Sequence, residues 1–138
     1  MRKPGKHQLV AAALEARERA VAPYSKFKVG AALLTRSGEI ITGANVESAS
    51  YGLTCCAERT AIFAALTSGR RDFVACAVVA RAPGGAMPCG ACRQILSEYA
   101  PKAVVYVADS AKPKVVRKFT MKQLLPGAFV SLRAPKRP

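Results

Sequence analysis

Three cysteines and one glutamate form a pattern in this chain that is suited to chemistry. Glu58 stands two residues after Cys56, and the segment Pro88-Cys89-Gly90-Ala91-Cys92 supplies a second and a third cysteine. Cysteine thiolates bind zinc, and catalytic zinc sites keep one position open for water, whereas structural sites fill all four positions with protein ligands. Because the protein ligands stop at three and a carboxylate stands beside them, the pattern predicts an open zinc site in which Glu58 handles the protons of the water.

The segments around these cysteines predict two helix starts. One helix is expected from about Cys55 to Ser68, where Gly69 stops it, and another from Gly90 to Tyr99. Helix N-termini carry free N–H groups and a partial positive charge, which favour thiolate over thiol. Two such N-termini pointed at one place would make a cradle for zinc. Arg59 is expected to donate hydrogen bonds to a ligand sulfur and so offset the charge of three thiolates.

The remaining apolar segments predict an α/β fold. They comprise a helix over about 5–21, a hairpin of strands over about 27–35 and 39–45, and two further strands over about 73–81 and 103–108. An edge-like strand over about 115–119 and a helical turn over about 121–125 follow. A hairpin followed by alternating strands and helices predicts a three-layer α/β/α arrangement around a mixed sheet of about five strands. The length of 138 residues predicts one domain over 1–138, with about 131–138 as a frayed tail.

The charge balance raises the question of a polyanionic partner. The chain has 22 Lys and Arg against 8 Asp and Glu, for a net charge of +14, and after Tyr99 its one acidic residue is Asp109. Aromatic residues do not alternate with the basic ones as they do in grooves for single-stranded nucleic acid. A solvated, self-repelling surface is therefore the preferred interpretation, and nucleic-acid binding is an alternative that the pattern does not favour.

Cysteine use and hydropathy predict the compartment. Five cysteines are an odd number, three of them fit a metal pattern, and the basic N-terminal segment lacks the apolar stretch of a secretory signal. These features favour a reducing compartment, and we expect a cytoplasmic protein. No apolar run is long enough to cross a bilayer, so no membrane partner is expected.

Motifs along nearly the whole chain resemble the small homotetrameric cytidine deaminases, the zinc-dependent branch with three cysteine ligands. The resemblance runs from Ala22-Pro23-Tyr24-Ser25 to the segment 124–129. Between these ends it rests on four motifs: Phe27-x-Val29-Gly30-Ala31-Ala32, Asn45-Val46-Glu47, Cys56-Ala57-Glu58-Arg59 and Pro88-Cys89-Gly90-Ala91-Cys92-Arg93-Gln94. It implies a cytidine deaminase-like fold and a hydrolase that acts on a cyclic amidine C–N bond. The implied reaction converts cytidine and 2′-deoxycytidine to uridine and deoxyuridine plus ammonia in pyrimidine salvage.

The resemblance implies a catalytic centre with one zinc ion per subunit. The zinc ligands would be Cys56, Cys89 and Cys92, and zinc would activate the water that attacks C4 of cytosine. Glu58 would move protons between the water, the ring nitrogen and the leaving ammonia. Arg59 would support the ligand sulfurs.

The resemblance also implies substrate contacts and an assembly. Phe27 would stack on the pyrimidine, and the backbone of Ala57 would meet the carbonyl edge of the base. The nucleoside would contact the motif Asn45-Val46-Glu47, with Asn45 and Glu47 on the ribose hydroxyls. Three residues would reach into a neighbouring subunit's site in a homotetramer with shared active sites: Ala49, Tyr51 and Phe129.

Each of these substrate residues has a plainer interpretation. An aromatic residue at a strand start is usually core, so Phe27 could be buried, and Asn45 could be a turn residue. Glu47 could be a solvated carboxylate, and Tyr51 and Phe129 could be packing residues, of which Phe129 is the better candidate for burial. A strand position predicts that Cys76 is a small core residue.

Three other functions are alternatives to the deamination of free cytidine and 2′-deoxycytidine. The positive charge suits a deaminase that acts on nucleic acid, but a ribose 3′ hydroxyl held by Glu47 would leave no room for a continuing phosphodiester. A deaminase of the blasticidin type would use the same zinc motif. A zinc-stabilised RNA-binding module without catalysis would need a fourth protein ligand and would leave Glu58 without a function.

Overall fold

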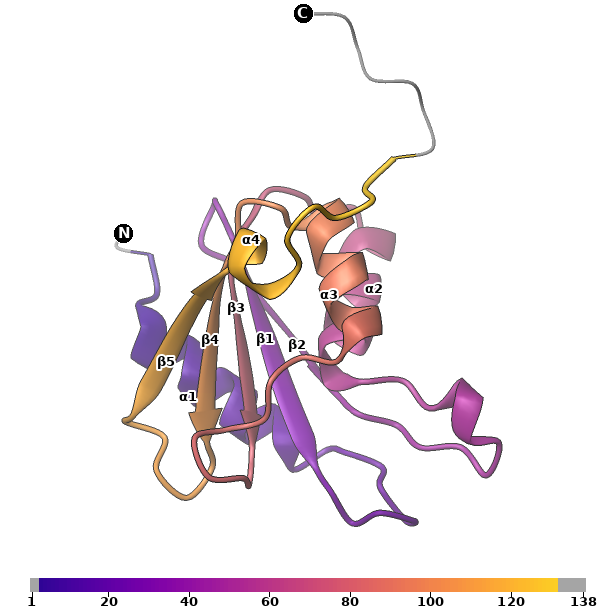
Figure 1. The fold of residues 1–138 in the computed structure, drawn as a ribbon. Coiled ribbons are helices and arrows are strands. Elements are labelled where there is room, and N and C mark those ends of the chain that lie inside the picture. Colours follow the sequence, from indigo (N-terminus) through magenta and orange to yellow (C-terminus); the bar gives the residue numbers. More distant parts are fainter. Residues whose placement is uncertain (1–2, 132–138) are drawn as a thin grey trace, which may run out of the picture.

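A five-stranded mixed sheet in the order β2-β1-β3-β4-β5 forms the middle layer of the molecule (Figure 1). The computed structural model describes residues 3–131. The strands are β1 (Val29–Thr35), β2 (Ile40–Ala44), β3 (Phe73–Ala80), β4 (Val104–Asp109) and β5 (Val116–Thr120). β3 and β4 pair in parallel, and the other three neighbouring pairs are antiparallel. The predicted three-layer α/β/α arrangement with five strands is confirmed.

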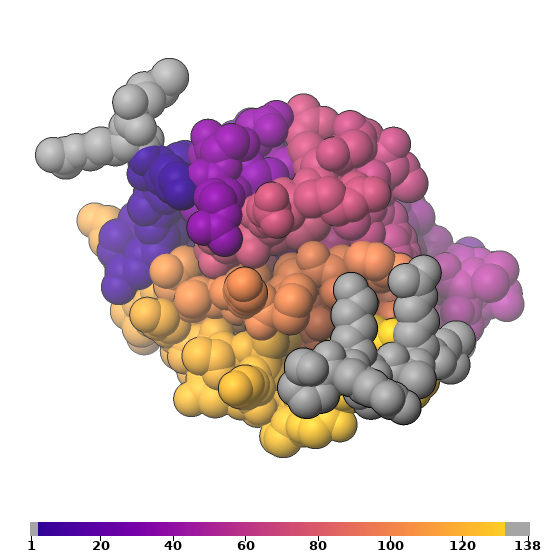
Figure 2. Space-filling model, turned by 90° about the horizontal axis from the view of Figure 1, so that it is seen from above, coloured from indigo at the N-terminus to yellow at the C-terminus, as the bar shows by residue number. Residues whose placement is uncertain are grey.

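The helices cover both faces of this sheet. They are α1 (Lys6–Arg17), α2 (Ala57–Thr67), α3 (Gly90–Tyr99) and the short α4 (Met121–Leu124), and a 3-10 turn η1 spans Tyr51–Leu53. α1 packs on one face, while α2 and α3 lie together on the other (Figure 1). The loop that carries η1 projects from the body of the molecule in both views (Figures 1 and 2).

The central strand β3 explains how the two layers of helices share one sheet. Its sequence FVACAVVA is apolar throughout, which is typical of a strand that is covered on both faces. Successive side chains alternate between the faces. Ala75, Ala77 and Val79 join the cluster beneath α1, whereas Cys76 and Val78 join the cluster beneath α2 and α3.

Two glycines let the helices approach the β1–β2 hairpin closely. A Cβ atom on Gly43 would lie 2.4 Å from both the backbone nitrogen of Ala61 and Oγ1 of Thr60, which belong to α2. On the opposite face, a Cβ atom on Gly30 would lie 1.9 Å from the carbonyl oxygen of Ala13 in α1. Because α2 begins at the predicted zinc motif, the contact at Gly43 fixes that motif against the hairpin.

Most elements match the sequence prediction, but the first helix is shorter than expected. α1 ends at Arg17 and not near residue 21. The backbone of Val21 is used elsewhere, because its N–H donates to the carbonyl of Asn45 at 2.9 Å and its carbonyl accepts from Glu47 N–H at 2.8 Å. The side chain of Arg17 turns away to the carbonyl of Lys28 at 3.0 Å. Pairing with a distant segment thus ends the helix.

Two further expectations concern a frayed C-terminal tail and the lack of a segment that could cross a membrane. The predicted tail falls almost entirely on residues 132–138, which lie outside the described residues. Within residues 3–131, each helix is too short or too polar to cross a membrane.

Candidate active site

The three predicted cysteine ligands meet where α2 and α3 begin. Cys56 caps the N-terminus of α2, Cys89 caps that of α3, and Cys92 lies in the first turn of α3. The Cys56 and Cys89 sulfurs are 3.6 Å apart, the Cys89 and Cys92 sulfurs are 3.5 Å apart, and all three lie within 4.8 Å of one another. Tetrahedral zinc with Zn–S bonds of about 2.3 Å needs sulfurs about 3.8 Å apart. The spacing therefore fits three ligands of one zinc ion.

The ionisation of these sulfurs also fits a cation. The Cys56 thiol has its pKa lowered to about 5, because Cys92 and then Arg59 donate hydrogen bonds to its sulfur. In contrast, the pKa of Cys92 is raised, because its thiol donates to Cys56 and is buried. Without a cation, one thiolate thus forms at the expense of its neighbour. A divalent cation would supply the charge that lets all three ionise.

Arg59 lies beside the cluster as predicted. Its Nη2 is 3.3 Å from Cys56 Sγ, and it lies one helical turn from that residue along α2. The pKa of Arg59 is raised, chiefly by this hydrogen bond to Cys56. The guanidinium therefore stays charged and can offset part of the negative charge of three thiolates.

Glu58 lies beside the cysteine cluster, and its carboxyl is buried. Its side chain is 3% exposed, and burial raises the pKa of the carboxyl above its usual range. It lines a cavity of about 220 Å³ together with Cys56, Cys89 and Phe27. The other residues around this cavity are Val29, Asn45, Thr54, Val78, Ala86 and Met87. A carboxyl whose pKa lies nearer neutrality is suited to accepting and returning a proton.

Hydrogen bonds hold the loops that carry this cavity. Asn45 is buried, and its amide accepts from Val29 N–H and donates to the Phe27 carbonyl, both at 2.8 Å. Arg93 Nε donates to the Pro88 carbonyl at 2.8 Å, which fixes the residue before Cys89. Phe27 is 41% exposed at the cavity, so its interpretation as a core residue is wrong.

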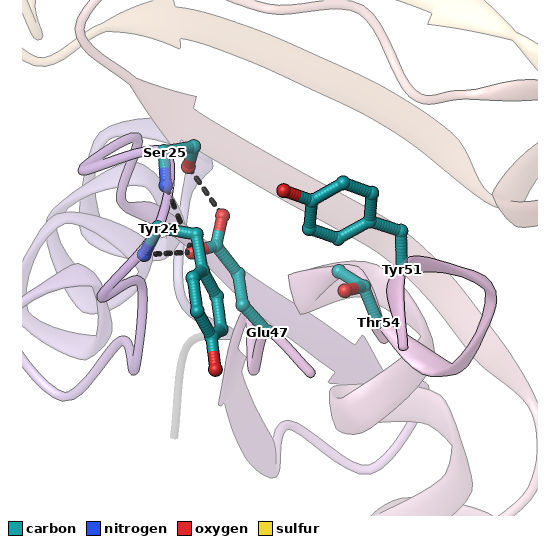
Figure 3. Close-up of a pocket in the computed structure, with 5 residues that line it drawn as sticks. All are labelled: Tyr24, Ser25, Glu47, Tyr51 and Thr54. Carbon is teal, nitrogen blue, oxygen red and sulfur yellow. Dashed lines mark hydrogen bonds between the residues drawn. The ribbon is translucent and has the colours of Figure 1, made fainter. Parts of the chain in front are cut away.

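A second cavity, of about 370 Å³, adjoins the first. It is lined by Tyr24, Ser25, Glu47, Tyr51 and Thr54, of which Thr54 also lines the cavity of the cysteines. Glu47 accepts hydrogen bonds from Tyr24 N–H at 2.9 Å, from Ser25 N–H at 3.1 Å and from the Ser25 hydroxyl (Figure 3). These bonds hold the pKa of Glu47 below its usual range, and the bond from the Ser25 hydroxyl has the largest effect. Glu47 is therefore a bound carboxylate beside the zinc motif, not a freely solvated one.

Two further predicted substrate residues adjoin the zinc ligand Cys56, Ala57 along the chain and Val46 through backbone hydrogen bonds to Cys55. Ala57 is fully buried at the first position of α2, so its N–H points out of the helix end. Val46 exchanges two backbone hydrogen bonds with Cys55, at 3.0 and 2.9 Å. These bonds tie the segment Asn45-Val46-Glu47 to the residue before Cys56.

The structure does not bring the three predicted intersubunit residues into the cavity of the cysteines. Ala49 and Tyr51 are exposed on the projecting loop, with Tyr51 77% exposed. Phe129 is 62% exposed, and its carbonyl accepts from Gln94 Nε2 at 2.5 Å. Phe129 is therefore not buried within the single chain.

Seven residues of the two cavities were not predicted as site residues. They are Tyr24, Ser25, Val29, Thr54, Val78, Ala86 and Met87. None carries a charge or a metal ligand. For Tyr24 and Ser25 the available signal was the motif Ala22-Pro23-Tyr24-Ser25, which places them three and two residues before Phe27. Cys76, in contrast, is fully buried as predicted.

Comparison with known proteins identifies the family of this chain. Residues 4–108 match the family described as the cytidine and deoxycytidylate deaminase zinc-binding region. The chain belongs to the cytidine deaminase family. A cytidine deaminase from Halalkalibacterium halodurans is 50% identical over 127 residues, which cover 91% of this chain and 95% of that protein. A blasticidin-S deaminase from Bacillus cereus is 34% identical over 74% of this chain and 76% of its own.

Solved structures of cytidine deaminases share the fold. A 1.6 Å crystal structure from Burkholderia pseudomallei is similar with a TM-score of 0.87 and 50% identity, over 91% of this chain and all of that one. One from Mycobacterium tuberculosis has a TM-score of 0.75 and 38% identity, over 88% of this chain and 94% of that one. Membership of the cytidine deaminase family and the zinc-binding region that it carries confirm the sequence prediction.

Proposed function

We propose that the protein hydrolyses cytidine and 2′-deoxycytidine to uridine and deoxyuridine, with release of ammonia, in pyrimidine salvage. The observation that carries this proposal is one cavity lined by two of the three cysteines, Cys56 and Cys89, by the buried Glu58 and by the exposed Phe27. Cys56, Cys89 and Cys92 would hold the zinc. When bound, zinc would polarise water and stabilise negative charge that develops in the reaction.

Glu58 acts as the proton carrier in this proposal. Its carboxylate takes a proton from the attacking water and gives it to N3 of the cytosine ring. It then takes the second proton of the added water and delivers it to the amine that leaves C4 as ammonia. Burial supports this role, because it raises the pKa of the carboxyl and so favours the protonated form that must return a proton.

The remaining predicted residues bind and orient the nucleoside. Phe27 stacks on the pyrimidine, and the N–H of Ala57 at the start of α2 donates to the carbonyl oxygen of the base. Asn45 has one amide hydrogen beyond its two backbone bonds, and Glu47 has acceptor capacity beyond its three. Both side chains can therefore contact ribose hydroxyls, with Val46 setting their spacing.

A homotetramer with shared active sites would complete each site. The support is the exposure of apolar side chains at the two places named for intersubunit contact: Tyr51 and Leu53 on the projecting loop, and Phe129 and Val130 near the C-terminal end. Such side chains on a surface mark interfaces. Light scattering on the zinc-loaded protein should give the mass of four chains, and the mass of one chain would contradict this part of the proposal.

We place the enzyme in the cytoplasm because all five cysteines are free thiols and three of them form the metal cluster. Reducing conditions would keep those sulfurs available to zinc. A fusion to a fluorescent protein tests this assignment by microscopy, with a diffuse cytoplasmic signal as the expected result.

A substrate panel tests the reaction and its specificity. The absorbance of cytidine, 2′-deoxycytidine, blasticidin S and a cytidine-containing oligonucleotide is followed with zinc-loaded protein. The two free nucleosides should be converted rapidly. Faster conversion of blasticidin S, or of cytosine within the oligonucleotide, would replace the salvage reaction with one of the alternative deaminations.

A further inference from the structure

The carboxylate of Glu47 is held by one short turn that leads into the cavity of the cysteines. Oε1 accepts from Tyr24 N–H at 2.9 Å and from Ser25 N–H at 3.1 Å, and Oε2 accepts from the Ser25 hydroxyl (Figure 3). A carboxylate has about four lone-pair positions that can accept hydrogen bonds. With three of them taken, Glu47 has one acceptor position left for a ligand.

The Ser25 hydroxyl also contacts the residue that would stack on the base. Phe27 N–H donates to Ser25 Oγ at 3.0 Å. A hydroxyl has one hydrogen to donate, and an ionised carboxylate can only accept. Ser25 Oγ–H therefore points to Glu47, and its lone pair faces Phe27. One side chain thus links a predicted ribose ligand to a predicted base-stacking residue.

The backbone of this turn does not depend on the hydroxyl. Lys26 N–H donates to the Ala22 carbonyl at 3.0 Å, and Lys26 adopts a left-handed conformation with φ of 62°. Beyond Phe27, the Asn45 amide holds the strand at both Phe27 and Val29. Ser25 is exposed, so its loss leaves no cavity in the core. The hydroxyl therefore orients the side chain of Glu47 and holds the backbone N–H of Phe27, and it does not build the fold.

We propose that Ser25 is a positioning residue that sets the enzyme's selectivity for the nucleoside 3′ hydroxyl, by orienting the free acceptor of Glu47 relative to the ring of Phe27. This inference rests on the proposed function, in which Glu47 binds the ribose. Cytidine and 2′-deoxycytidine share no 2′ hydroxyl, so a contact that serves both must lie elsewhere on the sugar. The low pKa of Glu47, caused first by the Ser25 hydroxyl, keeps this acceptor ionised.

The test compares cytidine with 3′-deoxycytidine in four proteins: wild type, Ser25→Ala, Ser25→Thr and Ser37→Ala. Ser37→Ala is the matched control, since it removes an exposed hydroxyl from the β1–β2 turn. Hydrogen bonds to charged groups contribute roughly 1.5–3 kcal/mol, so wild type should prefer cytidine by about 10- to 100-fold in kcat/KM. Ser25→Ala should raise KM for cytidine by about tenfold with a small change in kcat, and should leave 3′-deoxycytidine nearly unchanged.

The conservative variant and a binding measurement separate positioning from a general defect. Ser25→Thr keeps a hydroxyl and should restore most of the preference, and Ser37→Ala should keep all of it. Dissociation constants of uridine and 3′-deoxyuridine from calorimetry should follow the same order without turnover. Equal losses for both sugars in Ser25→Ala would overturn the positioning role while the deaminase function stands. A wild type that converts cytidine without distinguishing the two sugars would overturn the inference together with the ribose role of Glu47. Wild type that does not convert cytidine would overturn the proposed function.

Discussion

Arg59 Nη2 lies 3.3 Å from the sulfur of Cys56, one turn further along the same helix. The guanidinium thereby carries positive charge to the edge of a cluster in which three sulfurs lie within 4.8 Å. Three thiolates leave a bound Zn²⁺ with a formal charge of −1, which would weaken its action on water. This contact thus connects a residue that neither binds the metal nor touches substrate to the chemistry of the site.

The contact predicts a specific defect for Arg59→Ala. Loss of the hydrogen bond and the charge should weaken zinc binding or turnover by about 10- to 100-fold, with a smaller change in KM. Zinc affinity from competition with a chromophoric chelator, together with kcat and KM, measures this. Arg71→Ala, which removes an exposed arginine far from the cysteines, is the control. A defect confined to KM would contradict the role of Arg59.

Removal of zinc should change the reactivity of particular thiols. Cys76 is fully buried and burial raises its pKa, so it should react with Ellman's reagent only in denaturant. Chelation should expose Cys56, whose pKa is lowered to about 5, and the exposed Cys89 to rapid reaction. Should Cys56 and Cys89 react equally fast before and after chelation, as judged by mass spectrometry of the labelled peptides, they are not zinc ligands.

The buried carboxyl of Glu58 should destabilise the zinc-free protein at neutral pH. Burial raises its pKa above the usual 4.5, so the folded state prefers the protonated form. Stability from this group is therefore full below about pH 4.5 and decreases as pH rises toward the raised pKa. Glu58→Gln has no such charge and should match wild type near pH 4 but exceed it by about 1–3 kcal/mol near pH 7. Urea unfolding of the chelated proteins measures this, and a constant difference across that range would show that Glu58 does not titrate abnormally.

Close packing at Gly43 should link fold stability to the zinc motif. The added Cβ of Gly43→Ala would lie 2.4 Å from two atoms of α2, so the helix must shift, at a cost of about 1–3 kcal/mol. Gly52→Ala is the control, because a Cβ atom there meets nothing within 4 Å. Thermal unfolding of the two variants should differ by several degrees. Equal melting temperatures would mean that α2 is not held by this contact.

The sequence predicted the elements that depend on local signals. α3 begins and ends at the residues expected from its motif and its apolar spacing, and the β1–β2 hairpin forms at Arg36-Ser37-Gly38, where Gly38 has a φ of 97°. The end of α1 was not predictable in this way. It is set by backbone pairing between Val21 and residues 45 and 47, which are distant in sequence.

The residues of the candidate site likewise fall into those that local sequence predicts and those that only the fold brings together. Cysteine and glutamate spacing located the metal cluster, since each ligand stands at a helix start that local sequence defines. Ser25 and Thr54 were missed because an uncharged side chain gains a role only from what the fold places beside it. Phe129 and Tyr51 remain exposed on the single chain, so their predicted contacts depend on an assembly.

The central claim is that Glu58 and the three-cysteine cluster together deaminate a free nucleoside. The most direct measurement follows the absorbance of cytidine with wild-type and Glu58→Gln proteins at equal zinc content, which is checked by elemental analysis. Wild type should form uridine rapidly, whereas the variant should keep its zinc and fold but lose a factor of about 100 to 10,000 in kcat, the range for a general acid–base group. Near-normal turnover by the zinc-loaded variant would contradict the account.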